Sequence, residues 1–198
     1  MLQFNTTEKY LLEDDFALLR PLEEKDFVHL LPFALQEPNT WQYSIQQAIG
    51  EEGLKNYIAN TLEARKKGLE YPFIVYDKTQ RTYAGSTRFY NISNWHQNLS
   101  LGYTWYGAKH RGTGLNKHCK FLLLSFAFEH CKAMRVEFHA DFENKHSIRA
   151  MKSIGCVEEG VLRQSMKKPD GQWRDTIVLS ILQSEWLERV KTLIAGQL

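Results

Sequence analysis

The residues with the clearest chemistry form a short turn, Arg111 to Asn116, with the sequence Arg-Gly-Thr-Gly-Leu-Asn. The turn separates a predicted strand that ends near Tyr106 from a predicted helix that begins near Leu115, so its backbone N–H groups would converge at a helix N-terminus. Glycines there permit unusual backbone angles and let a phosphate approach without meeting Cβ atoms, while the helix dipole and Arg111 favour negative charge. The turn therefore predicts an anion site of the kind that holds a pyrophosphate.

Two other glycine motifs that bind nucleotides fit the same residues poorly. A Walker loop requires Gly-Lys-Ser/Thr before the helix, but Leu115 and Asn116 follow Gly114. A dinucleotide fingerprint requires a third glycine at position 117, which is Lys117, and a first strand near the start of the domain. A nucleotide-binding protein therefore stays a remote alternative. A turn that merely links a strand to a helix is the other alternative, because short glycine motifs often mislead.

Length and composition restrict the class of protein. The chain has 198 residues, and we expect one domain spanning 1–198. Its 25 basic and 23 acidic side chains are scattered and give a formal net charge of +2, so we expect no nucleic-acid partner. The start lacks the order of a secretion signal and no apolar run approaches membrane-spanning length, so we expect a cytoplasmic protein without membrane association. Three cysteines without a Cys-x-x-Cys pair and seven dispersed histidines predict free thiols and no metal site.

The hydrophobic periodicity predicts elements in the order β-α-α-β-β-β-α-β-α-β-β, with a short helix at the C-terminal end. The expected strands cover 16–22, 72–76, 83–90, 99–106, 134–141, 157–167 and 176–182, and the expected helices cover 23–34, 50–67, 115–130 and 144–154. Gly102 interrupts its strand and predicts a bulge or a close backbone approach. No repeat or linker divides the chain, so we predict an α/β (α+β) domain with one mixed sheet.

The sequence resembles the GNAT acyltransferase superfamily, in particular its RimJ/RimL-like branch of protein and small-amine acetyltransferases. The resemblance covers nearly the whole chain and is carried by these segments: Leu19-Arg20-Pro21-Leu22 followed by Asp26, Gly102-Tyr103-Thr104-Trp105-Tyr106, Arg111-Gly112-Thr113-Gly114, Asp141 to Asn144 then Ser147, and Asp170-Gly171 with Arg174-Asp175. The family's loop pattern is Arg/Gln-x-x-Gly-x-Gly/Ala, from which Asn116 departs at the last position. The resemblance implies a single mixed, mostly antiparallel sheet flanked by helices on both faces.

The resemblance also implies that acetyl-CoA is the co-substrate and that no metal is needed. The backbone of the turn would hold the CoA pyrophosphate, the strand at Trp105 and Tyr106 would pair with the pantetheine arm, and Asn144 would orient the pantetheine or the acetyl end. The residues expected to bind CoA are Trp105, Tyr106, Arg111, Gly112, Thr113, Gly114, Leu115, Asn116, Asn144 and Ser147.

Acetyl transfer to an amine requires a neutral amine, donors for the oxyanion and a proton for the leaving thiolate. The family often places a glutamate two residues before the glycine that is here Gly102, but that position is Ser100, so a direct carboxylate base is absent there. Glu137, His139 and Asp141 share the polar face of one predicted strand and are the remaining candidates. A solvated or salt-bridged strand face is the alternative for each of them. His139 is the residue type that titrates nearest neutral pH.

The proton for the thiolate has a different candidate. The family often supplies it from a tyrosine at the position occupied by Met151, and methionine cannot donate a proton. Ser147, one turn into the same predicted helix, is our preferred replacement, with helix capping as its alternative role. We expect Ser147→Ala to lower kcat more than it raises the KM for acetyl-CoA.

The absence of a glutamate at position 100 affects which acceptor amine the site would favour. An α-amino group with a pKa of about 8 is roughly a tenth neutral at pH 7, whereas a lysine amine near about 10.4 is almost wholly charged, so a weakly equipped site favours the former. We expect Trp41, Tyr43 and Ser100 to contact the substrate, with a core-anchor role as the alternative for the tryptophan.

The leading hypothesis from the sequence is an N-acetyltransferase that acts on a protein N-terminus or a small amine by direct attack in a ternary complex. A non-catalytic acyl-CoA-binding module is the alternative, favoured by Ser100 and Met151. A homodimer is an open possibility for the assembly.

Overall fold

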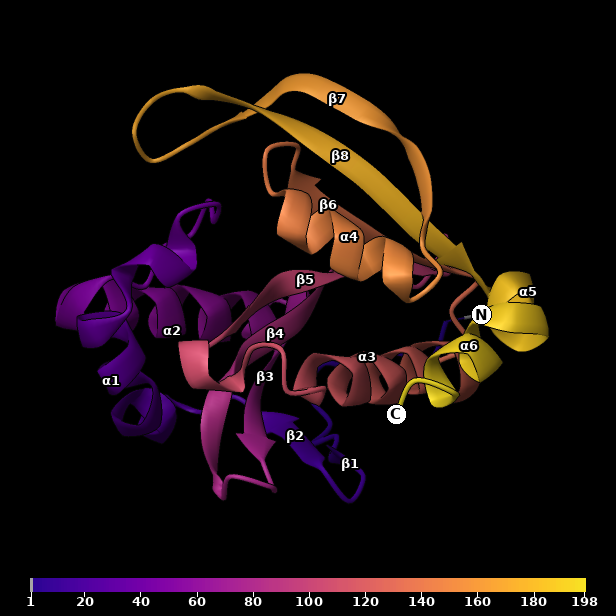
Figure 1. The fold of residues 1–198 in the computed structure, drawn as a ribbon, viewed down its shortest axis with the longest axis horizontal. Coiled ribbons are helices and arrows are strands. Elements are labelled where there is room, and N and C mark those ends of the chain that lie inside the picture. The colour runs from indigo at the N-terminus through magenta and orange to yellow at the C-terminus, as the bar shows by residue number, and fades with distance from the viewer. Residues whose placement is uncertain (1) are drawn as a thin grey trace.

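The computed structural model describes residues 2–198 and has one sheet of eight strands with helices around it (Figure 1). The strands are β1 (Leu12–Glu13), β2 (Ala17–Pro21), β3 (Glu70–Asp77), β4 (Thr82–Ser93), β5 (Asn98–Tyr106), β6 (Arg135–Asp141), β7 (Val157–Lys167) and β8 (Trp173–Leu182). The helices are α1 (Phe27–Gln36), α2 (Gly50–Lys66), α3 (Leu115–Ser125), α4 (Lys145–Ser153), α5 (Gln183–Glu185) and α6 (Lys191–Ala195). There are 3-10 turns at Glu24–Asp26, Pro38–Trp41 and Ala108–His110, and π-helical turns at Phe126–His130 and Trp186–Val190.

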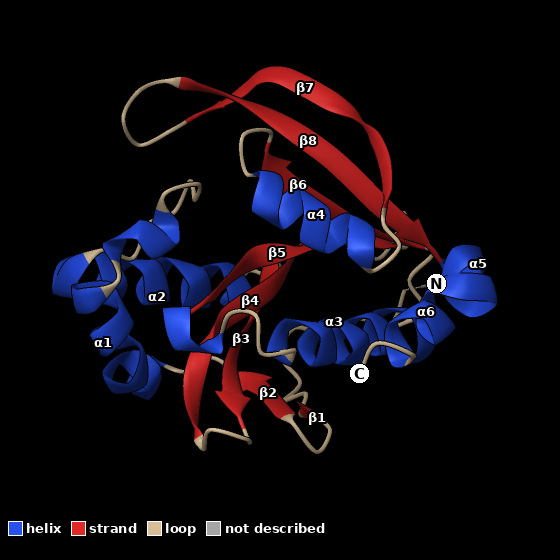
Figure 2. Cartoon of the chain, viewed as in Figure 1, coloured by secondary structure: helices blue, strands red, loops and turns tan. Residues whose placement is uncertain are grey.

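The sheet is mixed and mostly antiparallel. Its strands lie in the order β1-β2-β3-β4-β5-β6-β8-β7, and within residues 2–198 the single parallel pair is β5 with β6. The connection between these two strands runs through α3, because parallel neighbours need a crossover that returns the chain to the same edge. Figure 2 shows β7 and β8 as a long hairpin that arches away from the rest of the sheet. This topology confirms the predicted single mixed sheet.

Helices cover both faces of the sheet, as the resemblance implied. Phe73 and Val75 of β3 pack in one core cluster with Leu123 of α3, whereas Ile74 between them packs in the other with Leu30 of α1. Alternate side chains of a strand point to opposite faces, so α3 and α1 lie on opposite sides of β3. Burial on both faces also explains why β3 is almost continuously apolar. Within the described chain, no helix is both long and apolar enough to cross a membrane.

Most predicted elements are present, with some local differences. The helix predicted at 115–130 is present as α3 continued by the π-helical turn Phe126–His130. The bulge predicted at Gly102 is confirmed, because Tyr103 has a φ of 49° and the register between β4 and β5 shifts there. A Cβ at Gly102 would lie 3.0 Å from the ring of Tyr90, so the glycine makes room for that ring. Strand β1 is not predicted, because two residues are too few to display a period.

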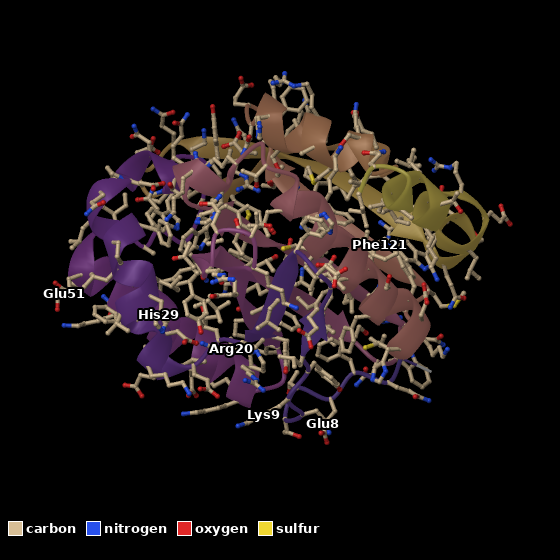
Figure 3. All side chains as sticks on the ribbon, turned by 60° about the horizontal axis from the view of Figure 1, so that its bottom comes forward. Glu8, Lys9, Arg20, His29, Glu51 and Phe121 are labelled. Carbon is tan, nitrogen blue, oxygen red and sulfur yellow. The ribbon has the colours of Figure 1, made fainter. Side chains whose placement is uncertain are left out.

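A buried ion pair joins β2 to the start of α1. Arg20 donates to both carboxylate oxygens of Asp26 at 2.8 and 2.6 Å and to the Tyr83 hydroxyl at 2.8 Å. The ring of His29 stacks on Tyr83, and Figure 3 labels Arg20 and His29 in this part of the molecule. Asp26 also accepts the Glu23 N–H at 2.9 Å. The Leu-Arg-Pro-Leu pattern with its later aspartate therefore fixes the α1–α2 layer against β2 and β4.

Candidate active site

The turn at 111–116 has the backbone geometry of an anion site. Gly112 and Gly114 have φ of 74° and 91°, in the left-handed region that favours glycine, and a Cβ at either position would meet nothing within 4 Å. Gly114 is also the N-cap of α3. Among the described residues, no acceptor takes the backbone N–H groups of Gly112, Thr113, Gly114 and Asn116. These donors and the N-terminal end of the helix dipole therefore face open space together.

Arg111 holds the turn in place. Its Nε donates to the carbonyl oxygen of Tyr106 at the end of β5 at 2.8 Å, and its Nη2 donates to Thr40 Oγ1 at 2.7 Å. The side chain thus ties the turn to β5 and to the 3-10 turn Pro38–Trp41. Arg111 contributes positive charge close to the turn, while its guanidinium is already engaged by the protein.

A second anchor lies just before the turn. His110 is 1% exposed, and its Nδ1 lies 2.8 Å from Asp77 Oδ2 at the end of β3. The hydroxyl of Thr113 donates to the carbonyl oxygen of His110 at 2.9 Å and accepts the N–H of Leu115 at 3.4 Å. Hydrogen bonds within the turn and a contact to the sheet therefore hold its backbone in place. This fixed backbone preorganises the free N–H groups.

Strands β5 and β6 pair over a short stretch and then separate. The ladder joins Asn98 to Ser100 with Arg135 to Glu137, and no pairing is recorded between the described residues beyond Ser100 and Glu137. Figure 1 shows the two strands diverging, with α4 in front of β6 and α3 below. The remaining part of β5 therefore has one edge without a strand partner, next to the turn that follows it. We call this opening between the two strands the splay.

The candidate base residues lie on β6 beside the splay. Glu137 is the direct ladder partner of Ser100, so its carboxylate lies one strand away from the position where a β5 carboxylate is missing. Glu137 Oε1 accepts from Arg135 Nε at 2.9 Å, and Glu137 Oε2 lies 3.2 Å from His139 Nε2. Both side chains are about a quarter exposed. A carboxylate that orients an imidazole is a common arrangement for proton transfer. The structure thus brings Ser100, Glu137 and His139 together, and Arg135 gives Glu137 a salt-bridge role as well.

Asp141, the third candidate on this strand, is engaged in the turn before α4. It is 3% exposed, its Oδ1 accepts the Glu143 N–H at 2.9 Å, and its Oδ2 lies 3.2 Å from Lys168 Nζ. These contacts favour the structural alternative for Asp141 over a role as base.

The start of α4 offers polar groups next to the same opening. Asn144 is the N-cap of α4, and its Oδ1 accepts the Ser147 N–H at 3.0 Å. The cap of this helix is therefore Asn144, and within residues 2–198 the Ser147 hydroxyl has no recorded hydrogen-bond partner. Met151 lies further along the helix at 7% exposed, on its buried face.

The aromatic residues predicted at the site differ in burial. Trp41 and Trp105 are 1% and 5% exposed, their ring centroids lie 5.0 Å apart, and both belong to the core cluster under α1 and α2. This burial favours the core-anchor role for Trp41. Tyr43 is exposed, and its carbonyl oxygen lies 3.5 Å from Arg174 Nη1 of β8. Tyr43 therefore lies next to β8, whereas the Trp41 side chain packs against Trp105 of β5.

Two cations near the splay are not predicted from the sequence. Lys120 of α3 is 6% exposed, and Arg174 of β8 is 7% exposed. Burial lowers the pKa of Lys120 to about 8 and also lowers the pKa of Arg174. Lys120 had a signal in the sequence, since it is a cation within the apolar run of its helix, between Cys119 and Phe121. Arg174 had none, because it stands in the polar run from Arg174 to Thr176, where no local pattern indicates burial.

Comparison with known proteins assigns the arrangement to a family. Residues 17–157 match the family model described as "Acetyltransferase (GNAT) domain", which is more than half of the chain. The chain belongs to the GNAT acetyltransferase family. The matched region contains the turn, the splay and α4. GNAT enzymes use acyl-CoA as co-substrate, and the free N–H groups and open glycines of the turn fit its pyrophosphate.

Individual GNAT relatives are more distant. A curated relative, "Putative ribosomal N-acetyltransferase YdaF" of Bacillus subtilis (strain 168), is 28% identical over 102 residues, which cover 52% of this chain and 55% of the relative. The chain thus matches about half the length of that relative. The crystal structure of an acetyltransferase candidate from T. thermophilus is 29% identical, covers 100% of both chains and has a TM-score of 0.87. A GCN5-related N-acetyltransferase from Brucella melitensis shares the fold, at 22% identity over 99% of this chain and 88% of that chain with a TM-score of 0.88.

Proposed function

We propose that this protein is an N-acetyltransferase that moves an acetyl group from acetyl-CoA to a primary amine by direct attack in a ternary complex. The observation that carries the proposal is the turn at the start of α3, where two left-handed glycines face open space beside the splay together with four N–H groups that have no acceptor in the described part of the chain. A pyrophosphate held there would lie next to the unpaired edge of β5. The RimJ/RimL-like resemblance supports the same reaction.

The residues that would hold acetyl-CoA follow from this geometry. The backbone of 111–116 would take the pyrophosphate. The backbone of β5 near Trp105 and Tyr106 would pair with the amides of the pantetheine arm, because the edge facing the splay has no strand partner. The Nδ2 of Asn144 and the hydroxyl of Ser147 would contact the arm from the start of α4, since the Oδ1 of Asn144 is already used as a cap.

The acceptor amine must lose its proton to become a nucleophile. His139 would take that proton directly or through a water, with Glu137 orienting its ring from 3.2 Å. Ser100 lies beside Glu137 and would contact the amine rather than deprotonate it, because a serine hydroxyl is no base by itself. An α-amine suits this site better than a lysine amine, since a larger fraction of it is already neutral near pH 7.

The acceptor proposed for the first tests is the α-amine of a protein N-terminus. The name of the B. subtilis relative directs attention to ribosomal proteins, whose acetylation would occur in the cytoplasm. Exposed Tyr43 lies where it could contact the chain that follows such an N-terminus. Small amines remain the second acceptor class.

The test is turnover of acetyl-CoA with a panel of acceptors. Peptides with a free α-amine, the same peptides with the α-amine blocked and one lysine left free, and a small polyamine are each incubated with the protein. We expect CoA release and a singly acetylated product with the free α-amine peptides, and roughly tenfold or more slower turnover with the blocked ones at pH 7. Equal rates for both peptide types would contradict the assignment of an α-amine acceptor.

A non-catalytic acyl-CoA-binding module is the second candidate, because Ser100 and Met151 replace the residues that the family often uses as base and acid. Calorimetric titration of CoA separates the two. Binding of CoA without turnover of any acceptor would support the module and contradict the enzyme.

A further inference from the structure

Lys120 is a buried cation that has no counter-ion among residues 2–198. Its side chain leaves α3 about one and a half turns after the glycine turn and is 6% exposed. Within residues 2–198 no carboxylate pairs with its Nζ, and the one hydrogen bond recorded for Nζ runs to Thr104 Oγ1 at 3.2 Å. The other lysine side chains of the described chain are exposed or partly exposed to solvent. An ammonium group that keeps one neutral partner after losing its hydration is costly to bury, so its position calls for a partner from outside the chain.

The two groups that Lys120 touches lie on opposite sides of the splay. Thr104, which accepts from Nζ, belongs to the part of β5 beyond its last pairing with β6. Phe138 is the first residue of β6 beyond that pairing, and the centroid of its ring lies 5.5 Å from Nζ. Nζ therefore lies between the two strands where they separate. A ligand that enters the splay from the glycine turn would meet this ammonium group.

Among the described residues, the elements packed around Nζ supply no anion to it. The titratable groups that act on the pKa of Lys120 are the thiols of Cys156, between α4 and β7, and Cys119, on α3. Burial raises the pKa of each thiol to about 12, so both stay neutral at physiological pH. Thr104 and Phe138 carry no charge. An anion that develops inside the splay would therefore have Lys120 as its nearest positive charge.

We propose that Lys120 is the acid that protonates the thiolate of CoA as it leaves. The inference rests on the proposed function and gives to Lys120, in place of Ser147, the role of the tyrosine that Met151 replaces. When the C–S bond of the tetrahedral adduct breaks, its electron pair stays on sulfur and the sulfur takes a proton from Nζ. The neutral amine of Lys120 regains a proton from solvent, and the amide nitrogen of the product releases one, so the enzyme returns to its starting state.

The test measures the pKa of the thiol of bound CoA, a quantity that does not depend on turnover. The ultraviolet absorbance of the CoA thiolate is followed against pH in the complex, with the complex of desulfo-CoA subtracted to remove tyrosine absorbance. The protein's own thiols do not interfere, since the pKa of each of Cys119, Cys131 and Cys156 is raised to about 12. We expect the pKa of the bound thiol to be lower in the wild type than in Lys120→Met by about one unit or more.

Two further variants make the result specific. Lys120→Arg keeps the positive charge but releases its proton far less readily, so it should keep the low pKa of bound CoA while kcat falls by roughly a hundredfold. Ser147→Ala should leave the pKa of bound CoA as in the wild type. In Lys120→Met, kcat should fall with little change in the KM for acetyl-CoA, and the fall in wild-type activity above about pH 8 should disappear.

The outcomes separate this inference from the proposed function. An equal pKa of bound CoA in the wild type and Lys120→Met, or a shift that follows Ser147→Ala instead, would overturn the role of Lys120 while leaving CoA binding intact. A folded wild type that binds no CoA would overturn the proposed function and this inference together. Circular dichroism of Lys120→Met checks its folding, and methionine has a similar length without the charge.

Discussion

Lys120 carries its charge into the interior of the protein, and this has a measurable effect on stability. Burial lowers the pKa of Lys120 from 10.5 to about 8 in the folded state. Between these two pH values the unfolded chain binds more protons than the native one, so the free energy of unfolding rises with pH through that window. Relative to Lys120→Met, the wild type should gain roughly 3 kcal/mol between pH 8 and pH 10.5.

Urea unfolding of both proteins across this pH range measures the difference directly. The comparison with the methionine variant removes the contributions of other lysines and tyrosines, which titrate in both proteins alike. Below pH 8 the methionine variant should be the more stable one, because it buries no charge. Parallel curves for the two proteins would mean that Lys120 is hydrated in solution, in conflict with its burial.

At the residue scale the sequence identifies motif positions, but it does not predict what surrounds each side chain. Ser100 and Met151 are recognised as departures from the family because they occupy motif positions. Alternation places Arg135, Glu137 and His139 on one face of their strand. It does not predict the hydrogen bonds that Glu137 makes with the other two. The burial of Arg174 is not predictable, because it depends on which distant segments close over its side chain, whereas the apolar run around Lys120 is a local signal of burial.

The glycine turn yields a prediction at the scale of an element. Gly114 and Gly171 have φ of 91° and 84°, and a Cβ at either position meets no atom within 4 Å. Gly114→Ala and Gly171→Ala should therefore cost similar stability, about 1 kcal/mol each, because both force alanine into a left-handed conformation. Gly114→Ala should weaken CoA binding by roughly tenfold or more, since its new methyl group enters the space assigned to the pyrophosphate.

The β7–β8 turn variant Gly171→Ala is the matched control and should bind CoA with wild-type affinity. Calorimetry gives both affinities, and thermal unfolding checks that the two variants lose similar stability. Unchanged affinity in Gly114→Ala, with the expected loss of stability, would remove the turn from the CoA site.

Local periodicity explains why most elements could be predicted. Strict alternation marks β6, the apolar face marks α3, and Gly102 marks the bulge in β5. The splay has no such signal, because it arises where the pairing of β5 with β6 stops after Ser100 and Glu137. That end point depends on α3 and α4 packing beneath and in front of the strands, which are contacts between segments distant in sequence.

For the whole molecule, the resemblance supplied what periodicity could not. The order β5-β6-β8-β7 places the C-terminal hairpin with its last strand inside the sheet, and no local pattern fixes that order. Residues scattered from β2 to β8 carry the family pattern, and the family match over 17–157 confirms the family. The fold and the family were thus accessible from sequence, whereas the position of the Lys120 side chain in the splay needed the structure.

A crystal structure of the protein with CoA and an N-terminally acetylated peptide tests the proposed site most directly. We expect pyrophosphate oxygens within hydrogen-bond distance of the N–H groups of 112–114 and Asn116, the pantetheine along the free edge of β5, and the sulfur beside Lys120 Nζ. The acetyl end of the peptide should lie on the His139 side of the splay. CoA phosphates bound away from the turn, or a pantetheine arm that does not enter between β5 and β6, would contradict the proposed site.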